Sequence, residues 1–267
     1  MWINSRTTPP YDSAQLTVFM IDSNYNSEVN VYRDSATGAS VMNTDSNFAY
    51  FVSRNRQISC FNFSDQSVSN CISDTNDIRL GKVIHDGGFK YLINGSRIIK
   101  EDMSSQIIWI SDSLFNMYGM MIHNGMVYAC GTDGYKSCTT QDCWGDYDPI
   151  IAKWNANGAL IWKKNYEKSN VDDIDKLFAI AIDEAGDIVT IGITGPWDQG
   201  AKYIYSIVVD TNGVLASEKI FSNNSTSISS MNYLEDVKLV SLKNRTASLT
   251  FRGQIDGMSS FYAELSY

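Results

Sequence analysis

Basic residues are scarce in this sequence. Its 267 residues include 21 Lys and Arg against 30 Asp and Glu, which gives a net charge of −9 and a pI near 4.7. Nucleic acids and anionic membranes attract positively charged surfaces, so this balance argues against both as partners. An acidic surface instead suits a soluble extracellular protein or a site for cations.

Long hydrophobic runs are also lacking. No stretch approaches the roughly 18 apolar residues that a membrane helix needs, so we expect no membrane insertion. Residues 1–15 contain Arg6 and two prolines but no apolar core, and they do not resemble a signal peptide. For an exported protein, we therefore expect the signal peptide to be absent from this chain.

Catalytic motifs are missing as well. The sequence has two histidines, His85 and His123, and no cluster of His and Cys has the spacing of a zinc site. It contains neither the Gly-x-Ser-x-Gly motif of a nucleophile elbow nor a glycine-rich phosphate loop. These absences favour a protein that is not an enzyme.

What the sequence has instead is a repeated strand pattern. A turn residue, a strand of alternating apolar positions and a small or polar stop recur in segments that begin at Asn47, Gly88, Gly125, Gly186 and, more weakly, Arg245. The first three begin roughly 40 residues apart, and a period of 40–50 residues with four strands per unit is typical of propeller blades. The pattern predicts an all-β fold, a β-propeller of four-stranded antiparallel blades.

The clearest copy runs from Asp148 to Phe221. Asn157-Gly158 and Asn212-Gly213 are dipeptides that accept positive φ and turn one strand back on the next. The segments Ile150–Trp162 and Ile180–Thr194 resemble the SBBP-type β-propeller repeat of bacterial secreted and cell-surface proteins. The resemblance implies a propeller in an extracytoplasmic setting, and it implies no catalytic residues because that family is defined by its scaffold.

The ends of the chain bear on the number of blades. We expect residues 1–15 to form an N-terminal arm and residues 16–267 to form one propeller domain. Two strands near 16–20 and 29–33 have the pattern of an outer pair, and the last unit has strands near 236–242, 246–252 and 259–266. A strand from the N-terminal region that completes the last blade would remove exposed edges. This gives five blades, or six or more if the chain is a fragment.

Five cysteines indicate an oxidising compartment. A two-residue turn at Asp65-Gln66 places Cys60 opposite Cys71, at a separation that suits a disulfide. A bridge between Cys138 and Cys143 would restrain a long polar loop. Cys130 is expected to be a small buried hydrophobic residue in a strand. The alternative to two disulfides is five free, buried thiols.

Two loops carry the candidate binding residues. The long loop at 132–148 holds Tyr135, Trp144 and Tyr147, whose aromatic faces suit sugar rings or a protein partner. The loop at 195–200 adds Trp197 and Asp198. Both loops follow the second strand of a blade and leave the same side of a propeller, so we expect one contact surface. The alternative is that both tryptophans fold back and fill gaps between blades.

The long loop is also a candidate metal site. It holds the four aspartates Asp133, Asp142, Asp146 and Asp148, which supply the oxygen ligands that calcium prefers. Their spacing does not fit an EF-hand loop. We expect no cofactor other than calcium at this loop.

Together these features predict a non-catalytic binding or structural module at the cell surface, such as an adhesin or a filament subunit. Its partner would be a protein or a glycan. The first alternative is a carbohydrate-binding lectin. A lyase or glycoside hydrolase is a further alternative, and it would need two carboxylates that converge in one pocket.

Overall fold

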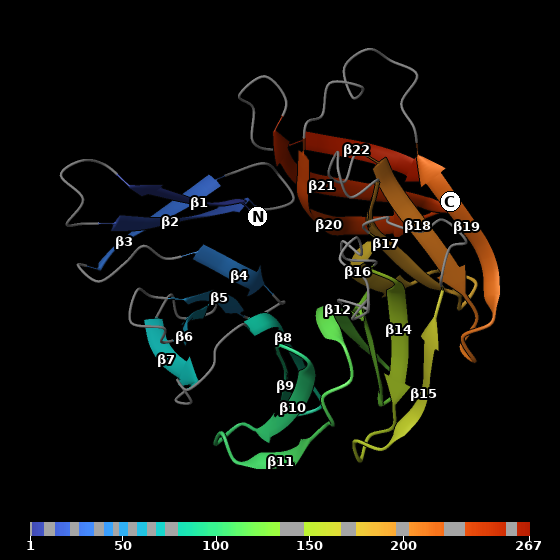
Figure 1. The fold of residues 1–267 in the computed structure, drawn as a ribbon. Coiled ribbons are helices and arrows are strands. Elements are labelled where there is room, and N and C mark those ends of the chain that lie inside the picture. Colours follow the sequence, from blue (N-terminus) through green and yellow to red (C-terminus); the bar gives the residue numbers. More distant parts are fainter. Residues whose placement is uncertain are drawn as a thin grey trace, which may run out of the picture. The chain divides into compact units, whose positions relative to one another are not determined.

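In the residues that it describes, the computed structural model consists of β-strands and their connections (Figure 1). It describes residues 2–7, 14–21, 27–34, 40–44, 48–52, 58–62, 68–72, 80–133, 147–166, 175–195, 203–221, 233–254 and 261–267. No helix in this part of the chain has the length and apolar character of a membrane span. The chain divides into two compact units, residues 1–94 with 101–106 and residues 95–100 with 107–267.

The first unit contains two complete sheets. They are a three-stranded sheet of order β1-β2-β3 and a four-stranded sheet of order β4-β5-β6-β7, with all neighbours antiparallel. Their strands are β1 (Trp2–Thr7), β2 (Ala14–Ile21), β3 (Ser27–Asp34), β4 (Ser40–Thr44), β5 (Phe48–Val52), β6 (Ile58–Asn62) and β7 (Val68–Ile72). The division between the units passes through the next sheet, of order β11-β10-β9-β8, which consists of β8 (Leu80–Asp86), β9 (Phe89–Asn94), β10 (Arg97–Asp102) and β11 (Ile107–Ile110).

The second unit contains three further sheets, each in simple sequence order. One is formed by β12 (Asn116–His123), β13 (Met126–Thr132), β14 (Pro149–Trp154) and β15 (Leu160–Asn165). The next is formed by β16 (Lys176–Ile182), β17 (Ile188–Thr194), β18 (Tyr203–Val209) and β19 (Leu215–Phe221). The last has three strands, β20 (Tyr233–Lys243), β21 (Thr246–Gln254) and β22 (Phe261–Ser266).

These sheets confirm the predicted fold class of four-stranded antiparallel units. The range 1–15, predicted as an arm, contains β1, which pairs with β2 from Trp2 opposite Phe19 to Thr7 opposite Ala14. The described strands therefore form six sheets, four with four strands and two with three. The number of blades and the limits of the domain stay predictions.

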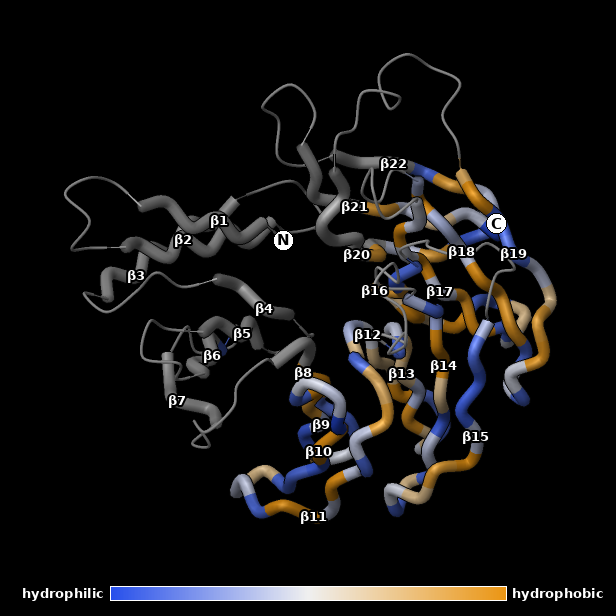
Figure 2. The backbone as a smooth tube through the Cα atoms, in the orientation of Figure 1, coloured by the Kyte–Doolittle hydropathy of each residue, from blue (hydrophilic) through white to orange (hydrophobic). Residues whose placement is uncertain are grey.

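In the sheets of the second unit for which burial is described, the middle strands form the core. Every residue of β17 is buried, and so are Ile204 to Val209 of β18, whereas β19 is exposed from Leu215 to Ile220. A strand that is buried on both faces needs apolar or small residues throughout, which explains the run Ile188-Val-Thr-Ile-Gly-Ile-Thr194. Figure 2 shows the same contrast in the neighbouring sheet, where β14 is hydrophobic and β15 becomes hydrophilic along its length.

The innermost strands carry a repeated bulge. The register shifts after Met117 in β12 and after Leu177 in β16, and the extra residues are Tyr118 and Phe178. Their rings stack with centroids 5.1 Å apart, so equivalent bulges of neighbouring sheets contact each other. A bulge changes the direction in which a side chain points, and here it brings the two aromatic rings together.

The outer hairpins share one five-residue turn. In residues 155–159, Asn155 Oδ1 accepts hydrogen bonds from the N–H groups of Asn157 and Ala159, both at 3.0 Å. Asp210 makes the same two bonds in residues 210–214, and Asp183 makes them in the inner turn at 183–187. Only the glycine of each predicted Asn-Gly pair has positive φ, so the predicted turns are present but are longer than two residues.

Acid is expected to weaken the turn at Asp210. The N–H of Val214, together with Asn212, holds the pKa of Asp210 below its ordinary value. Because the pKa is lower in the folded state, the ionised Asp210 side chain contributes to the free energy of unfolding. This contribution is complete above the unfolded pKa near 4 and is lost as the pH falls through the folded pKa. Asp210→Asn should keep the turn, since Asn155 serves in the equivalent position, and should reduce the acid sensitivity. Urea unfolding of both proteins at pH 7 and pH 3 measures this, and equal acid sensitivity would contradict it.

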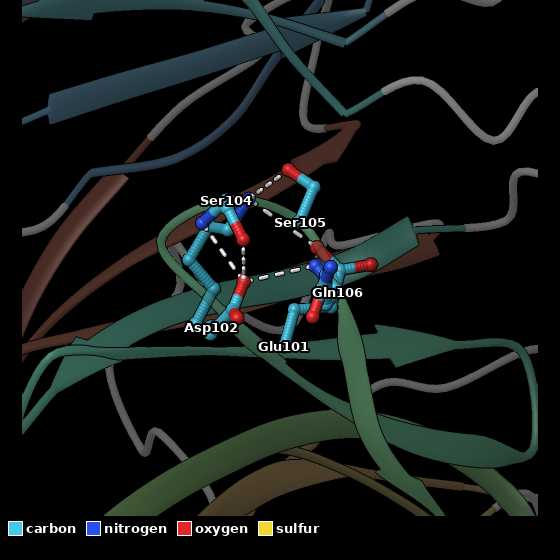
Figure 3. Close-up of polar contacts among 6 residues, drawn as sticks. Glu101, Asp102, Ser104, Ser105 and Gln106 are labelled. Carbon is cyan, nitrogen blue, oxygen red and sulfur yellow. Dashed lines mark hydrogen bonds and ion pairs between the residues drawn. The ribbon is translucent and has the colours of Figure 1, made fainter.

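The turn at residues 102–106 is a variant without glycine (Figure 3). Asp102 Oδ1 accepts from the N–H groups of Ser104 and Gln106 at 2.8 and 2.9 Å, and Ser105 takes the position with positive φ. The Nζ of Lys90 donates to Ser105 Oγ at 2.6 Å and lies 3.3 Å from Glu101 Oε2. Lys90 and Glu101 are both buried, so Ser105 helps to satisfy an ammonium that water barely reaches.

We therefore expect an unusual order of stability among variants at Ser105. Ser105→Ala keeps the left-handed strain and loses the hydrogen bond to Lys90, which should cost about 1–2 kcal/mol. Ser105→Gly loses the same bond but relieves about 1 kcal/mol of strain, so its stability should lie between that of Ser105→Ala and the wild type. Free energies of unfolding for the three proteins give the order, and Ser105→Gly more stable than wild type would show that the bond contributes less than the strain that glycine relieves.

Tryptophans and lysines join neighbouring sheets by a repeated contact. Trp109 of β11 donates its indole N–H to the Ala156 carbonyl at 3.0 Å, and Lys100 of β10 reaches the same oxygen at 3.2 Å. In the next sheet Trp162 and Lys153 meet the Thr211 carbonyl in the same way, at 3.2 and 3.1 Å. The outer hairpin turns at 155–159 and 210–214 are therefore each held by the last two strands of the sheet before them.

The predicted register of Cys60 and Cys71 is wrong. In the structure Phe61 lies opposite Val68 and Cys60 lies opposite Ser69, while the register shifts where Cys71 occurs. The predicted turn would have placed Phe61 opposite the polar Asn70. The observed register places it opposite Val68, and such an apolar cross-strand pair is more favourable. This register does not support a Cys60–Cys71 bridge. Cys130 is confirmed as a buried thiol in β13, and Cys138 and Cys143 lie outside the described residues.

Candidate functional site

The long loop that follows β13 leaves from a closely bonded base. Its described residues are Asp133 at one end and Tyr147 and Asp148 at the other. The N–H of Asp133 donates to the Asp148 carbonyl at 3.2 Å, and the buried Thr132 hydroxyl donates to the same oxygen at 3.0 Å. Thr132 also lies opposite Pro149 in the β13–β14 ladder. The two ends of the loop are therefore fixed to each other and to the sheet.

The Asp148 side chain points back to its own sheet. It is 3% exposed, and its Oδ2 accepts a hydrogen bond from Asn165 Nδ2 at 3.0 Å. Asn165 is the last residue of β15 and lies opposite Ile150, so the bond ties the outer strand to the end of the loop. Asp148 thus anchors the loop base, a role that its position among loop aspartates did not suggest.

Tyr147 connects the loop to the next sheet. Its carbonyl accepts a hydrogen bond from the N–H of Asp175 at 3.0 Å, and the Nζ of Lys176 lies 4.8 Å from its ring centroid. Such a contact between an ammonium and an aromatic ring is favourable, more so where water is excluded. Burial lowers the pKa of Lys176, in accord with its half-buried position. One predicted binding residue is therefore held at the loop base by the start of β16.

Acidic side chains and a buried tyrosine interact next to the Tyr147 end of the loop. Tyr205 of β18 is fully buried, and burial together with the Glu218 and Asp175 carboxylates raises the pKa of its hydroxyl. Asp175 is 4% exposed and therefore buried. Sequence analysis did not select Asp175, Asn165 or Tyr205, because they come from three segments whose proximity depends on how the sheets pack.

The other predicted site residues are not placed by the structure. Tyr135, Asp142, Trp144 and Asp146 lie in the part of the long loop outside the described residues, as do Trp197 and Asp198 of the second loop. Among the residues that are described, no group of three or more His, Cys, Asp or Glu side chains is arranged to hold a metal ion. Calcium binding by Asp133, Asp142, Asp146 and Asp148 stays a prediction.

A second feature is a hollow of about 130 Å³ at the turns that follow β16 and β20. Antiparallel strands place these turns at the opposite end of the sheet from the connection that follows a second strand. The hollow is lined by carboxylates, cations and a phenol, from Asp183, Glu184, Lys243, Arg245 and Tyr267. Burial, with a contribution from Asp183, raises the pKa of Tyr267 to about 12, so the phenol is neutral at pH 7.

Comparisons with known proteins bear on the fold. No family model matches the sequence, and a comparison with curated proteins gives no match. The structure is similar to the WD40 domain of Pan2 from Neurospora crassa, with 9% identity, 96% of this chain and 72% of that chain covered, and a TM-score of 0.55. It is also similar to Hsv2 from Kluyveromyces lactis with loop 6CD replaced by a Gly-Ser linker, with 10% identity, coverage of 98% and 80%, and a TM-score of 0.52.

The chain is a β-propeller. Each four-stranded sheet is a blade, and the long loop joins the second and third strands of the β12–β15 blade. Since no family model matches, the resemblance to the SBBP-type repeat rests on the sequence pattern alone.

Proposed function

We propose that this propeller is a non-catalytic binding module at the cell surface and that the loop between β13 and β14 is its main contact element. The loop carries Tyr135 and Trp144, and the corresponding loop of the next blade carries Trp197 and Asp198. Aromatic side chains of this kind are enriched where a protein partner covers them. The module would serve adhesion or the assembly of a surface filament.

The bonded loop base is the observation that carries this proposal. Thr132, Asp133 and Asp148 close the loop by hydrogen bonds, and Asn165 fixes the Asp148 carboxylate. Tyr147 joins the next blade through Asp175 and Lys176. A rigid scaffold that holds both ends of a long polar loop is a common way to present binding residues.

The extracytoplasmic setting rests on separate support. The chain is acidic, with a net charge of −9, and its 148–220 region resembles an SBBP-type repeat of secreted and surface proteins. Fractionation of cells that produce the protein from its complete natural gene tests the setting directly. Recovery in the cytosolic fraction alone would contradict it.

Replacement of residues 134–146 by a Gly-Ser-Gly-Ser linker tests the role of the loop. This variant keeps Asp133, Tyr147 and Asp148 and hence the bonded base. Wild type and variant are immobilised and offered proteins extracted from the surface of the source cells, followed by chemical cross-linking. We expect a defined partner to bind the wild type and to bind the variant at least about tenfold more weakly. Equal binding to both would contradict the proposal.

A matched control and two further arms sharpen the result. Glu184→Gln changes the turn between β16 and β17, at the other end of the blade, and should bind as the wild type does. A glycan array in place of cell-surface proteins identifies the lectin alternative. Loss of binding in a calcium chelator, with recovery on added calcium, would support the predicted ligands Asp133, Asp142, Asp146 and Asp148.

A further inference from the structure

The outer edge strand β11 is apolar and exposed. It is the last strand of its sheet, in the order β11-β10-β9-β8, and reads Ile107-Ile-Trp-Ile110. Ile107, Ile108 and Ile110 are 52%, 51% and 48% exposed. An edge strand presents alternate backbone N–H and C=O groups outward and is a template for another strand.

Two other outer strands of the described blades, β15 and β19, are protected by charge, whereas β7 is also uncharged but is interrupted by the polar Ser69 and Asn70. β15 carries Lys163 and Lys164, and β19 carries Glu218 and Lys219. Charged side chains on an edge strand oppose pairing with another strand, because pairing removes them from water. By contrast, no charged residue occurs between Met103 and Ser111, a difference that is visible along β11 and β15 in Figure 2.

The two faces of β11 differ in what they contact. Trp109 turns toward the next blade, where its indole N–H donates to the Ala156 carbonyl and its ring covers the position of a Cβ on Gly158. Because side chains alternate along a strand, Ile108 and Ile110 lie together on the opposite face. They form a small apolar surface directly beside the strand edge.

We propose that β11 pairs with β11 of a second copy of this chain, in an antiparallel arrangement about a twofold axis at Trp109. This register places Ile108 of one copy opposite Ile110 of its partner, so four isoleucines meet on one face of a continuous sheet. A chain with a net charge of −9 repels a second copy, and the uncharged stretch around β11 is where two copies approach without opposing like charges. Self-pairing of β15 would instead bring Lys163 and Lys164 of both copies together.

Sedimentation velocity over about 1 to 200 µM tests the proposal, a range that covers the weak affinity expected of a contact made by one short strand. We expect the wild type to shift reversibly from monomer to dimer as its concentration rises. The double variant Ile108→Lys/Ile110→Lys should remain monomeric, with self-association weakened at least about tenfold. Ile161→Lys, on the protected strand β15 and at a site 48% exposed, should form dimers as the wild type does.

A second variant separates loss of pairing from loss of folding. Ile108→Thr/Ile110→Thr adds no charge and keeps residues that favour strands, so it should fold with an unchanged circular dichroism spectrum and still be monomeric. A wild type that stays monomeric throughout the range would overturn the proposal. So would dimers that persist in both double variants, because the contact would then lie elsewhere.

Discussion

Replacement of Gly192 by alanine is expected to lower the free energy of unfolding by about 3 kcal/mol or more. A Cβ at this position would lie 2.0 Å from the carbonyl oxygen of Lys176 and 2.9 Å from the Cα of Leu177. Both are backbone atoms of the neighbouring strand β16, so no side chain can rotate away to make room. The β16–β17 ladder would have to open beside its bulge. Urea unfolding of the two proteins measures the loss.

Gly186→Ala is the matched control for this prediction. Gly186 has a φ of +88°, and a Cβ there would meet no atom within 4 Å. Its replacement should cost only the strain of a left-handed conformation, about 1 kcal/mol. Similar losses for the two variants would show that close packing of the strands at Gly192 is not the cause. Gly131, in the equivalent position of β13, should behave as Gly192 does.

Replacement of Trp162 by alanine is expected to cost about 2 kcal/mol, less than the loss for a fully buried tryptophan because this ring is half-buried. Its indole N–H donates to the Thr211 carbonyl, and its ring lies 3.1 Å from the position of a Cβ on Gly213. The change should weaken the contact between the β12–β15 and β16–β19 blades. Thermal and urea unfolding give the size of the effect.

Trp162→Phe separates the two parts of this contact. Phenylalanine keeps most of the ring packing and loses only a hydrogen bond to a solvent-exposed turn, so it should cost about 1 kcal/mol. Ser217→Ala is the control, since Ser217 is the exposed residue of β19 at the position that corresponds to Trp162 and should tolerate the change. A loss for Trp162→Ala no larger than that for Ser217→Ala would contradict the role of the tryptophan in joining blades.

Much of the fold was predictable because local signals agreed. The glycines at 158, 186 and 213 have the positive φ that their turns need, and the flanking apolar runs became the strands of the β12–β15 and β16–β19 blades. β1 was not predicted as a strand because its residues Asn4, Ser5 and Arg6 are all polar and do not alternate with apolar residues. The register of β6 and β7 was missed because the connection between them is not the two-residue turn at Asp65-Gln66. Phe61 already lies opposite Val68, two residues from its predicted partner, before the register shifts at Cys71.

The site was less predictable because its parts meet only through packing. Asp133 and Asp148 were selected as calcium ligands, but their described contacts close the loop through the backbone, and Asn165 binds the Asp148 carboxylate. Lys176 was not selected, since only the position of the next blade places it over Tyr147. The contacts of Trp109 and Trp162 with the turns of the next blade depend on the same packing and carry no local signal.

The most direct test replaces residues 134–146 by a Gly-Ser-Gly-Ser linker and measures the free energy of unfolding. It shows whether the blade is stable without the long loop, as a loop that serves binding requires, or whether the loop is part of the core. The bonds of Thr132, Asp133 and Asp148 remain in this variant, and a shorter loop costs little entropy. We predict a value within about 1 kcal/mol of the wild type. A loss of about 3 kcal/mol or more, as expected for the removal of a buried aromatic side chain, would show that the loop is part of the core.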